Sequence, residues 1–421
     1  MSLSNPWFLA ALVSVLGVFH LELFATFLNL ARLGKTIPAV IADLYPDDVL
    51  ERTRDYISET TRHHLLQSSV SLALLMGFWW SGGFGWLQRI ADSLGGTPLL
   101  SSLVAIALVA LAQFLISLPF DIHSTFKIEA KHGFNRTTPA TFIGDQFKSL
   151  LLLALLGLPL AAVIIWFFQT QSLAALYAWL VVAAFSILMT WLSPRLIMPL
   201  FLKFQPLPDG ELRQSILALA EKLRFPVAEV SVVDGSRRST KANAFFAGFG
   251  KTRRIALFDT LIEKHTPDEI LAVLAHEIGH NKRRHVPIHL TVALAEMGLL
   301  FALLHVALKS PAFYHAFGVS TAAGTLPIGL GLILFGILYQ PVSLLTSLLS
   351  HALSRKHEFE ADAFAAQSLG TPTPLATGLK RLTTDHLAHP NPHPLTIALH
   401  YSHPPLAERL QALAASEGVA I

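Results

Sequence analysis

One ten-residue segment, Leu271–His280, carries side chains that could perform metal-assisted hydrolysis. It reads LAVLAHEIGH, which places the pattern HExxH within a helical repeat of apolar residues. On a helix, His276 and His280 lie one turn apart on a single face, so both imidazoles can reach one zinc ion. Glu277 lies about 100° further round, close enough to contact a water that the metal activates. The alternative is an ordinary helix whose two histidines bind no metal.

A catalytic zinc site needs a third protein ligand and one open position. The chain has no cysteine, so we expect a downstream carboxylate to complete the set. In the segment SRKHEFEADAF, Glu358 and Asp362 share a helical face at a spacing of four residues, whereas Glu360 points elsewhere. We predict that Glu358 is the third ligand and that Asp362 orients a ligand histidine. His357 is a weaker rival, and the alternative is an ordinary charged helix beside the membrane.

The elements around HExxH read as a small α+β unit. Thr266 is expected to cap the HExxH helix, and Glu269 closes a capping box with it. Apolar residues recur at helical spacing from Leu212 to Leu223, and two short β-rich segments, Glu229–Val233 and Ile255–Phe258, are typical of strands.

The composition places this unit in a membrane protein. Of the 421 residues 52% are hydrophobic and only 14% are charged, and the mean hydropathy is +0.52. A soluble domain draws about a quarter of its residues from the four charged types, so long stretches of this chain must face lipid. The absence of cysteine excludes disulfide frameworks and thiolate catalysis. The net charge of +3 is too small to indicate nucleic-acid binding.

Apolar stretches between charged residues predict seven membrane-spanning helices, because each span needs about 20 mostly apolar residues. A polar turn at Gln169–Ser172 divides the longest stretch into two. The expected spans are Pro6–Asn29, Leu65–Leu87, Pro98–Phe120, two spans between Lys148 and Arg195, one between Arg284 and Lys309, and Ile328–Leu349.

The spans divide the chain into four regions. Residues 1–200 hold spans one to five, residues 201–285 a first peptidase part with HExxH, residues 286–350 spans six and seven, and residues 351–421 a second peptidase part. Spans six and seven form a hairpin, which returns Glu358 to the face where HExxH ends. Of the 31 Lys and Arg residues, all except Arg89 and Lys309 fall in loops on one side. That bias predicts an external N-terminus and a cytoplasmic peptidase unit.

Taken together, HEIGH, the segment SRKHEFEADAFA after a two-span hairpin, and YSHPPLAERL at Tyr401–Leu410 resemble the CAAX prenyl protease type 1 family of integral-membrane zinc metallopeptidases. Lys131–Thr137, Asn243–Phe246 and Leu257–Thr260 are also similar to its signatures. The resemblance implies a mainly α fold, in which seven tilted helices enclose a water-filled chamber capped by an α+β zinc domain. It likewise implies Glu358 as the third ligand.

The resemblance also suggests roles for three further residues. His403 is expected to contact the scissile carbonyl or the developing oxyanion, although a buried capping histidine is the alternative. Asn243 is expected to bind substrate backbone, in a strand-like stretch where a peptide could add as a further strand. Its alternative is an ordinary edge-strand or turn asparagine. Arg409, in the segment YSHPPLAERL, is also expected to bind substrate.

The predicted activity is therefore zinc-dependent peptide hydrolysis. One zinc ion would polarise the carbonyl and acidify a water, and Glu277 would take the proton of the water and pass it to the leaving amine. The resemblance implies peptide substrates with a prenylated CAAX terminus, or equivalent membrane-associated peptides, held beside the lipid bilayer. The small net charge predicts no nucleic-acid partner. A membrane quality-control protease of the HtpX-like heat-shock family is an alternative, and so is a non-enzymatic transporter or scaffold. The compact, cysteine-free chain ends in Gly418–Ile421 without an obvious retrieval signal, which favours a bacterial cytoplasmic membrane over the endoplasmic reticulum.

Overall fold

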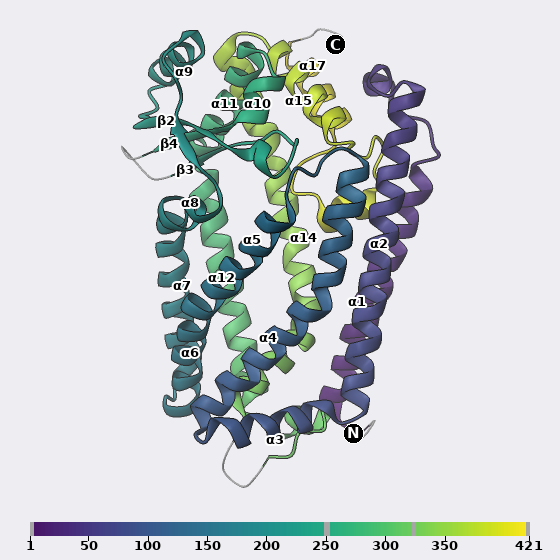
Figure 1. Ribbon diagram of the computed structural model, residues 1–421, viewed down its shortest axis with the longest axis vertical. Helices are drawn as coiled ribbons and strands as arrows, with labels where there is room; N and C mark the ends of the chain where they lie inside the picture. The colour runs from purple at the N-terminus through teal and green to yellow at the C-terminus, as the bar shows by residue number, and fades with distance from the viewer. Residues whose placement is uncertain (1–3, 248–252, 322–325, 418–421) are drawn as a thin grey trace.

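The computed structural model describes residues 4–247, 253–321 and 326–417 (Figure 1). Long helices form a bundle, and an α+β unit covers one of its ends, opposite the N-terminus. The last four residues, Gly418–Ile421, in which the sequence shows no obvious retrieval signal, lie outside the described residues. The bundle helices are α1 (Pro6–Arg32), α2 (Asp47–Trp80), α3 (Gly83–Gly95), α4 (Pro98–His123), α5 (Pro139–Leu152), α6 (Leu158–Thr170), α7 (Ala174–Leu192), α12 (His285–Leu308) and α14 (Ile328–Leu369).

The predicted membrane bundle is confirmed. Within the described ranges, six helices are long and apolar enough to cross a membrane, and the bent pair α2–α3 makes seven if it counts as one span. The expected turn between spans four and five is also present, because α6 ends at Thr170 and α7 begins at Ala174.

Span two differs from the expected single helix over Leu65–Leu87. The helix α2 ends at Trp80, and α3 leaves it at an angle of 74°, crossing the end of the bundle (Figure 1). Gly82 makes the turn with a φ of 77°, in the left-handed region that favours glycine. At Gly83 a Cβ atom would lie 2.5 Å from the Phe78 ring. The apolar pattern runs on through this turn, so a search for uncharged stretches does not detect it.

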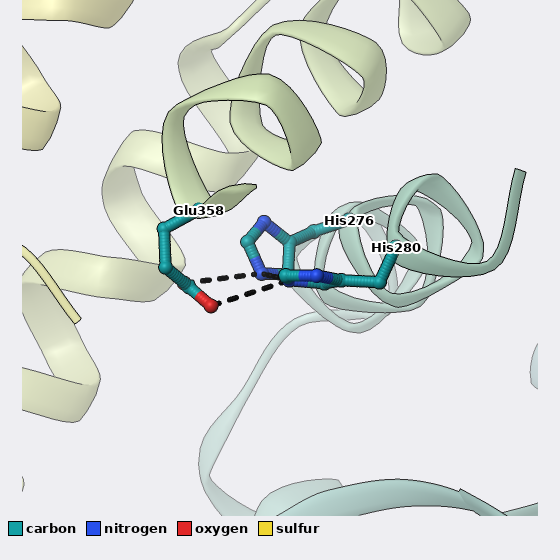
Figure 2. A group of neighbouring side chains, drawn as sticks. All are labelled: His276, His280 and Glu358. Atoms are coloured by element: carbon teal, nitrogen blue, oxygen red, sulfur yellow. Dashed lines mark hydrogen bonds and ion pairs between the residues drawn. The ribbon is translucent and has the colours of Figure 1, made fainter. Parts of the chain in front are cut away.

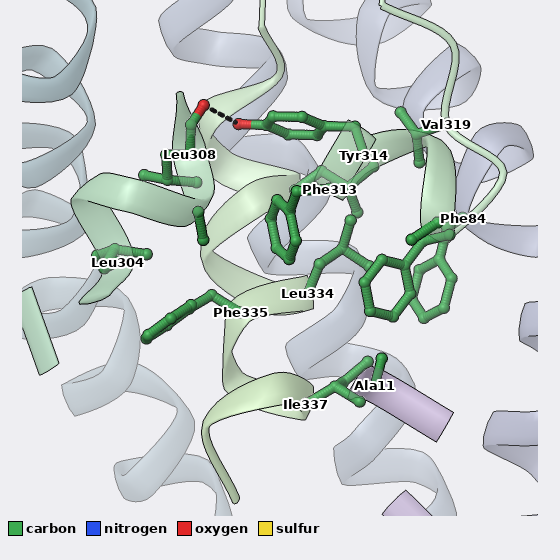
Figure 3. Close-up of a cluster of buried hydrophobic side chains, with 14 of the residues drawn as sticks. Ala11, Phe84, Leu304, Leu308, Phe313, Tyr314, Val319, Leu334, Phe335 and Ile337 are labelled. Carbon is green, nitrogen blue, oxygen red and sulfur yellow. Dashed lines mark hydrogen bonds between the residues drawn. The ribbon is translucent and has the colours of Figure 1, made fainter. Parts of the chain in front are cut away.

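An aromatic cluster fixes the end of the bundle where α3 lies (Figure 3). The Trp79 ring stacks on Phe317 at a centroid distance of 4.8 Å, and Phe84 meets Phe317 edge-on. The Trp79 indole Nε1 donates a hydrogen bond to the Ala316 carbonyl at 3.1 Å. Tyr314, on the short helix α13 (Pro311–Ala316), donates to the Leu308 carbonyl. These contacts join α2, α3 and α12 to α13.

The α+β unit contains a four-stranded sheet with the order β1-β2-β4-β3. Both predicted strands are confirmed, since β2 spans Glu229–Val233 and β4 spans Arg254–Phe258, and the two run parallel. The outer strands, β1 (Phe204–Pro206) and β3 (Ala244–Ala247), pair antiparallel with them. The surrounding helices are α9 (Glu211–Lys222), α10 (Asp259–Lys264), α11 (Pro267–Lys282), α15 (Thr373–Asp385), α16 (Pro394–His400) and α17 (Leu406–Glu417).

The hairpin of α12 and α14 connects the membrane bundle to the α+β unit. α14 is a single helix of 42 residues, and it continues beyond the bundle to pack against α11 (Figure 1). The two helices approach closely at Gly279, where a Cβ atom would lie 3.1 Å from the Phe364 ring and 3.3 Å from the Ala361 Cα. A larger residue at 279 would hold the helices apart, so this glycine sets the spacing across which their side chains meet.

Candidate metal centre

The HExxH helix begins where the sequence predicts. The Thr266 hydroxyl accepts from the Glu269 backbone N–H at 3.3 Å, and the Glu269 carboxylate accepts from the Thr266 N–H at 3.0 Å, which completes the predicted capping box. Pro267 occupies the first turn, where a missing N–H costs nothing. The helix then runs without interruption through His276 and His280, so their side chains project one turn apart.

Three side chains converge where α11 meets α14 (Figure 2). The ligand atoms of His276, His280 and Glu358 all lie within 4.8 Å of one another. The two imidazole Nε2 atoms are 3.1 Å apart, and the Glu358 carboxylate lies 3.5 Å from His276 Nε2 and 3.2 Å from His280 Nε2. Two imidazoles and one carboxylate are a common donor set for catalytic zinc, which leaves its fourth position open.

A bound cation would also satisfy an orphan atom. The Glu358 Oε2 atom is buried and makes no hydrogen bond to any described residue. His276 Nε2 and Arg409 Nη1 each lie 3.5 Å from this oxygen, too far for a hydrogen bond. A buried carboxylate oxygen without a hydrogen bond is costly, so its position beside the imidazole nitrogens fits a metal ion. The residues present therefore suit the metal that HExxH predicts.

Asp362 lies behind His276, on the side away from His280. Its Oδ1 atom is 2.8 Å from His276 Nδ1, as expected for a residue that orients this ring. The Arg409 guanidinium donates from Nε to Asp362 Oδ2 at 2.8 Å and from Nη2 to Oδ1 at 2.6 Å. Burial lowers the pKa of His276, but the hydrogen bonds with Asp362 and Glu358 outweigh it and raise that pKa to about 9. In the metal-free protein this imidazole is therefore protonated at neutral pH.

His280 has a partner that the sequence analysis missed. His285 Nδ1 lies 3.0 Å from His280 Nδ1, and His285 Nε2 lies 3.0 Å from the Glu360 carboxylate. The His357 ring stacks flat on His285 at 3.9 Å, so this rival ligand candidate is not in the ligand group. Arg284 adopts a φ of 60° and breaks the helix between His280 and His285. Helical spacing therefore gave no signal for this contact.

The other predicted site residues line a cavity of about 460 Å³ beside the ligand group. Glu277, Asn243, His403 and Arg409 all lie in its wall. The His403 side chain is 65% exposed and its Nε2 atom lies 3.4 Å from Glu358 Oε1, so it is not a buried capping residue.

Asn243 and Arg409 differ in what they contact. The Asn243 carbonyl accepts from the Phe258 N–H, and its side chain accepts from the Ala244 N–H, so it stands exposed just before β3. Arg409 is buried, and its guanidinium contacts Asp362 and, at 3.5 Å, Glu358. These contacts hold the ligand group in place and leave little of the guanidinium to a substrate.

Comparisons with known proteins cover nearly the whole chain. A family described as "CAAX prenyl protease N-terminal, five membrane helices" matches residues 26–203, and peptidase family M48 matches residues 206–417. The CAAX prenyl protease 1 homolog of Arabidopsis thaliana is 36% identical, covering 96% of this chain and 97% of that protein. The CAAX prenyl protease 1 of Saccharomyces cerevisiae is 33% identical over 97% and 95%. The crystal structure of S. mikatae Ste24p superposes with a TM-score of 0.91 at 33% identity, covering 97% of this chain and 99% of that one.

Proposed function

Because the chain belongs to peptidase family M48, with the membrane region of the CAAX prenyl proteases, we propose that its metal is zinc, held by His276, His280 and Glu358. The protein is a multi-pass membrane metalloprotease. Neither a quality-control protease of the HtpX-like type nor a transporter is favoured by these matches. The observation that carries the proposal is the convergence of two imidazoles on a buried carboxylate, one oxygen of which makes no hydrogen bond to a described residue.

Four side chains in or beside the cavity wall would act in peptide hydrolysis. Bound zinc would supply Lewis acidity to the peptide carbonyl and to the attacking water. Glu277 follows His276 on α11 and lines the same cavity, so its carboxylate takes a proton from the water and returns it to the leaving amine. The exposed His403 imidazole donates a hydrogen bond to the carbonyl oxygen as negative charge develops there. Asp362 and Arg409 fix the His276 ring and the Glu358 carboxylate.

The cavity and the sheet edge favour an extended peptide as substrate. In the described sheet, β3 is a terminal strand, paired with β4 along one side only. A substrate can add to its other side, with Asn243 binding the peptide backbone. The cavity wall also carries apolar side chains suited to aliphatic residues, namely Ile41, Leu261, Leu375, Leu379 and Leu382. A prenylated CAAX terminus, with aliphatic residues beside the modified cysteine, matches this lining. Its prenyl group would remain among the membrane helices below the α+β unit.

The orientation of the protein follows from its charges. The N-terminus and the α+β unit lie at opposite ends of the bundle (Figure 1). Of the 31 Lys and Arg residues in the sequence, 29 fall in the segments that join the expected spans on the side of the peptidase unit. This supports a cytoplasmic peptidase unit and an external N-terminus. The sequence-based preference for a bacterial cytoplasmic membrane stays a prediction, and both relatives quoted above are eukaryotic.

The decisive experiment compares wild-type protein with Glu277→Gln. Purified, zinc-loaded protein is given a farnesylated CAAX peptide and the same peptide without the lipid, and zinc content is measured alongside. We expect cleavage of the farnesylated peptide, a loss of about 10²- to 10⁴-fold in Glu277→Gln, and unchanged zinc content. Full activity in the zinc-bound variant would refute the role of Glu277. Equal cleavage of both peptides would refute selection for the prenyl group, and no cleavage of either would refute the CAAX substrate.

A further inference from the structure

A second cavity, of about 370 Å³, lies where span five meets the sheet. After α7 the chain continues through Ser193–Ile197 into the short helix α8 (Met198–Phe201), and then enters β1. Residues from this connection line one wall, and residues from β1, β2 and β4 line the other. None of the predicted catalytic, metal or substrate residues is in its lining.

Three cationic side chains line this cavity: Arg195, Lys203 and Arg254. Arg195 comes from the end of the span, Lys203 from the segment before β1, and Arg254 from β4. The Lys203 side chain has no hydrogen-bond or ion-pair partner among the described residues. A recess lined by three cationic side chains favours an anion.

Two acids lie near these cations, but neither lines the cavity. Glu229 pairs with Arg254 at 3.2 Å, and it also accepts a hydrogen bond from the Ser231 hydroxyl. The Asp234 carboxylate accepts the Lys203 backbone N–H at 2.7 Å. The three cations outnumber the two acids, so the net charge of these five side chains is positive.

One wall of the cavity comes from the end of a candidate membrane span, and the apolar rim is formed by the exposed residues beside that wall. α7 and its continuation to Phe201 form one candidate span, and near its end Trp191, Leu196 and Leu200 have exposed fractions of 45%, 59% and 48%. The Arg195 guanidinium lies over the Trp191 ring at 4.4 Å and donates to the Trp191 carbonyl. Tryptophan and arginine at the end of a span are typical of the depth at which lipid head groups lie.

We propose that this cavity binds the phosphate group of an anionic phospholipid from the leaflet on the peptidase side. The phosphate enters between Arg195 on the membrane side and Lys203 and Arg254 on the sheet side, while the acyl chains lie along the apolar rim. A soluble phosphate ester would meet the same cations but would leave that rim uncovered. The bound lipid joins span five to the sheet that carries β3.

The test measures binding of phosphatidylglycerol to full-length protein in phosphatidylcholine nanodiscs, with tightly bound lipids counted by native mass spectrometry. We expect Lys203→Gln to weaken the tightest site about fivefold and Lys203→Gln/Arg254→Gln about 25-fold, because each basic residue near a membrane contributes about that factor. The matched control is Lys35→Gln, which removes an exposed lysine after α1 at the same end of the bundle and outside the cavity. Lys203→Arg keeps the charge and should bind as wild type.

Each outcome decides the proposal. Equal binding by wild type and Lys203→Gln, or equal losses in Lys203→Gln and Lys35→Gln, would overturn it. A second arm titrates glycerol phosphate into protein in pure phosphatidylcholine, and binding as tight as that of phosphatidylglycerol would also overturn the lipid assignment. If Lys203→Gln lowers the thermal midpoint in pure phosphatidylcholine, the comparison of Lys203→Glu with Lys203→Arg replaces it, and equal lipid binding by these two would refute the site.

Discussion

Replacing Asp362 with asparagine should weaken metal binding by a predictable amount. The carboxylate accepts hydrogen bonds from His276 Nδ1 and from two nitrogens of Arg409, all at 2.8 Å or less, and its exposed fraction is 2%. Asparagine keeps the shape, but its NH2 group must face a donor on either His276 or Arg409. The loss of a partner behind a ligand histidine costs about 10- to 100-fold in metal affinity. Because ten-fold in affinity corresponds to about 1.4 kcal/mol, the expected cost is about 1.4–2.7 kcal/mol.

The substitution also leaves Arg409 without its main partner. Breaking a buried ion pair costs about 3–5 kcal/mol, and we expect the lower end because Glu358 still lies 3.5 Å from the guanidinium. The thermal midpoint of the metal-free protein should therefore fall. The matched control is Glu408→Gln, an exposed residue next to Arg409 on α17, which should change neither stability nor metal affinity.

A pH titration separates orientation of the ligand from general destabilisation. In the metal-free protein the pKa of His276 is raised to about 9, so below that pH the metal must displace a proton and its affinity rises with pH. Without the Asp362 carboxylate this pKa falls, and the affinity of Asp362→Asn should level off at a lower pH. Zinc affinity is measured by competition with a chromogenic chelator between pH 6 and pH 9 or so. Wild-type affinity with an unchanged pH profile in Asp362→Asn would refute the reasoning.

Two further substitutions test the site from other sides. His285→Phe preserves the ring stacked on His357 but removes the contact with His280, so metal affinity should fall about tenfold. Glu360→Gln, which removes the charge on the far side of His285, should give a smaller loss. Chelator competition measures both, and undiminished affinity in His285→Phe would show that this contact is dispensable. Gly279→Val should lower stability by about 1–3 kcal/mol and reduce metal content, because its Cβ meets Phe364 and Ala361. Thermal midpoints are compared with those of Gly336→Val, at a position where a Cβ atom meets no other described segment within 4 Å. Equal midpoints would contradict the packing argument.

The ligand group was predictable because its members depend on local rules. Four-residue spacing places His276 above His280, and the capping box at Thr266 fixes where that helix begins. The position of Glu358 beside the two histidines follows from topology, because two consecutive spans must return the chain to the side it left. Each of these steps needs only helix geometry and the thickness of a bilayer.

The remaining features depend on contacts between distant segments. Arg409 reaches Asp362 from α17, and no spacing within either segment indicates that these side chains meet. The contact of His285 with His280 depends on the left-handed backbone of Arg284, a conformation that arginine rarely adopts. The bend at Gly82 was hidden because the apolar composition continues through it.

The helix α14 carries both the last span and Glu358, with Pro341 inside it as the one position where a backbone hydrogen bond is missing. Its 42 residues extend for about 63 Å, and Glu358 lies about 45 Å from its membrane-embedded start. A tilt of only about 2° would therefore move Glu358 by about 1.6 Å, whereas metal sites tolerate about 0.2 Å. Because Gly279 packs closely against Phe364, a movement of α14 also moves α11. A change in bilayer thickness that tilts α14 would therefore move His276, His280 and Glu358 together relative to the lipid surface.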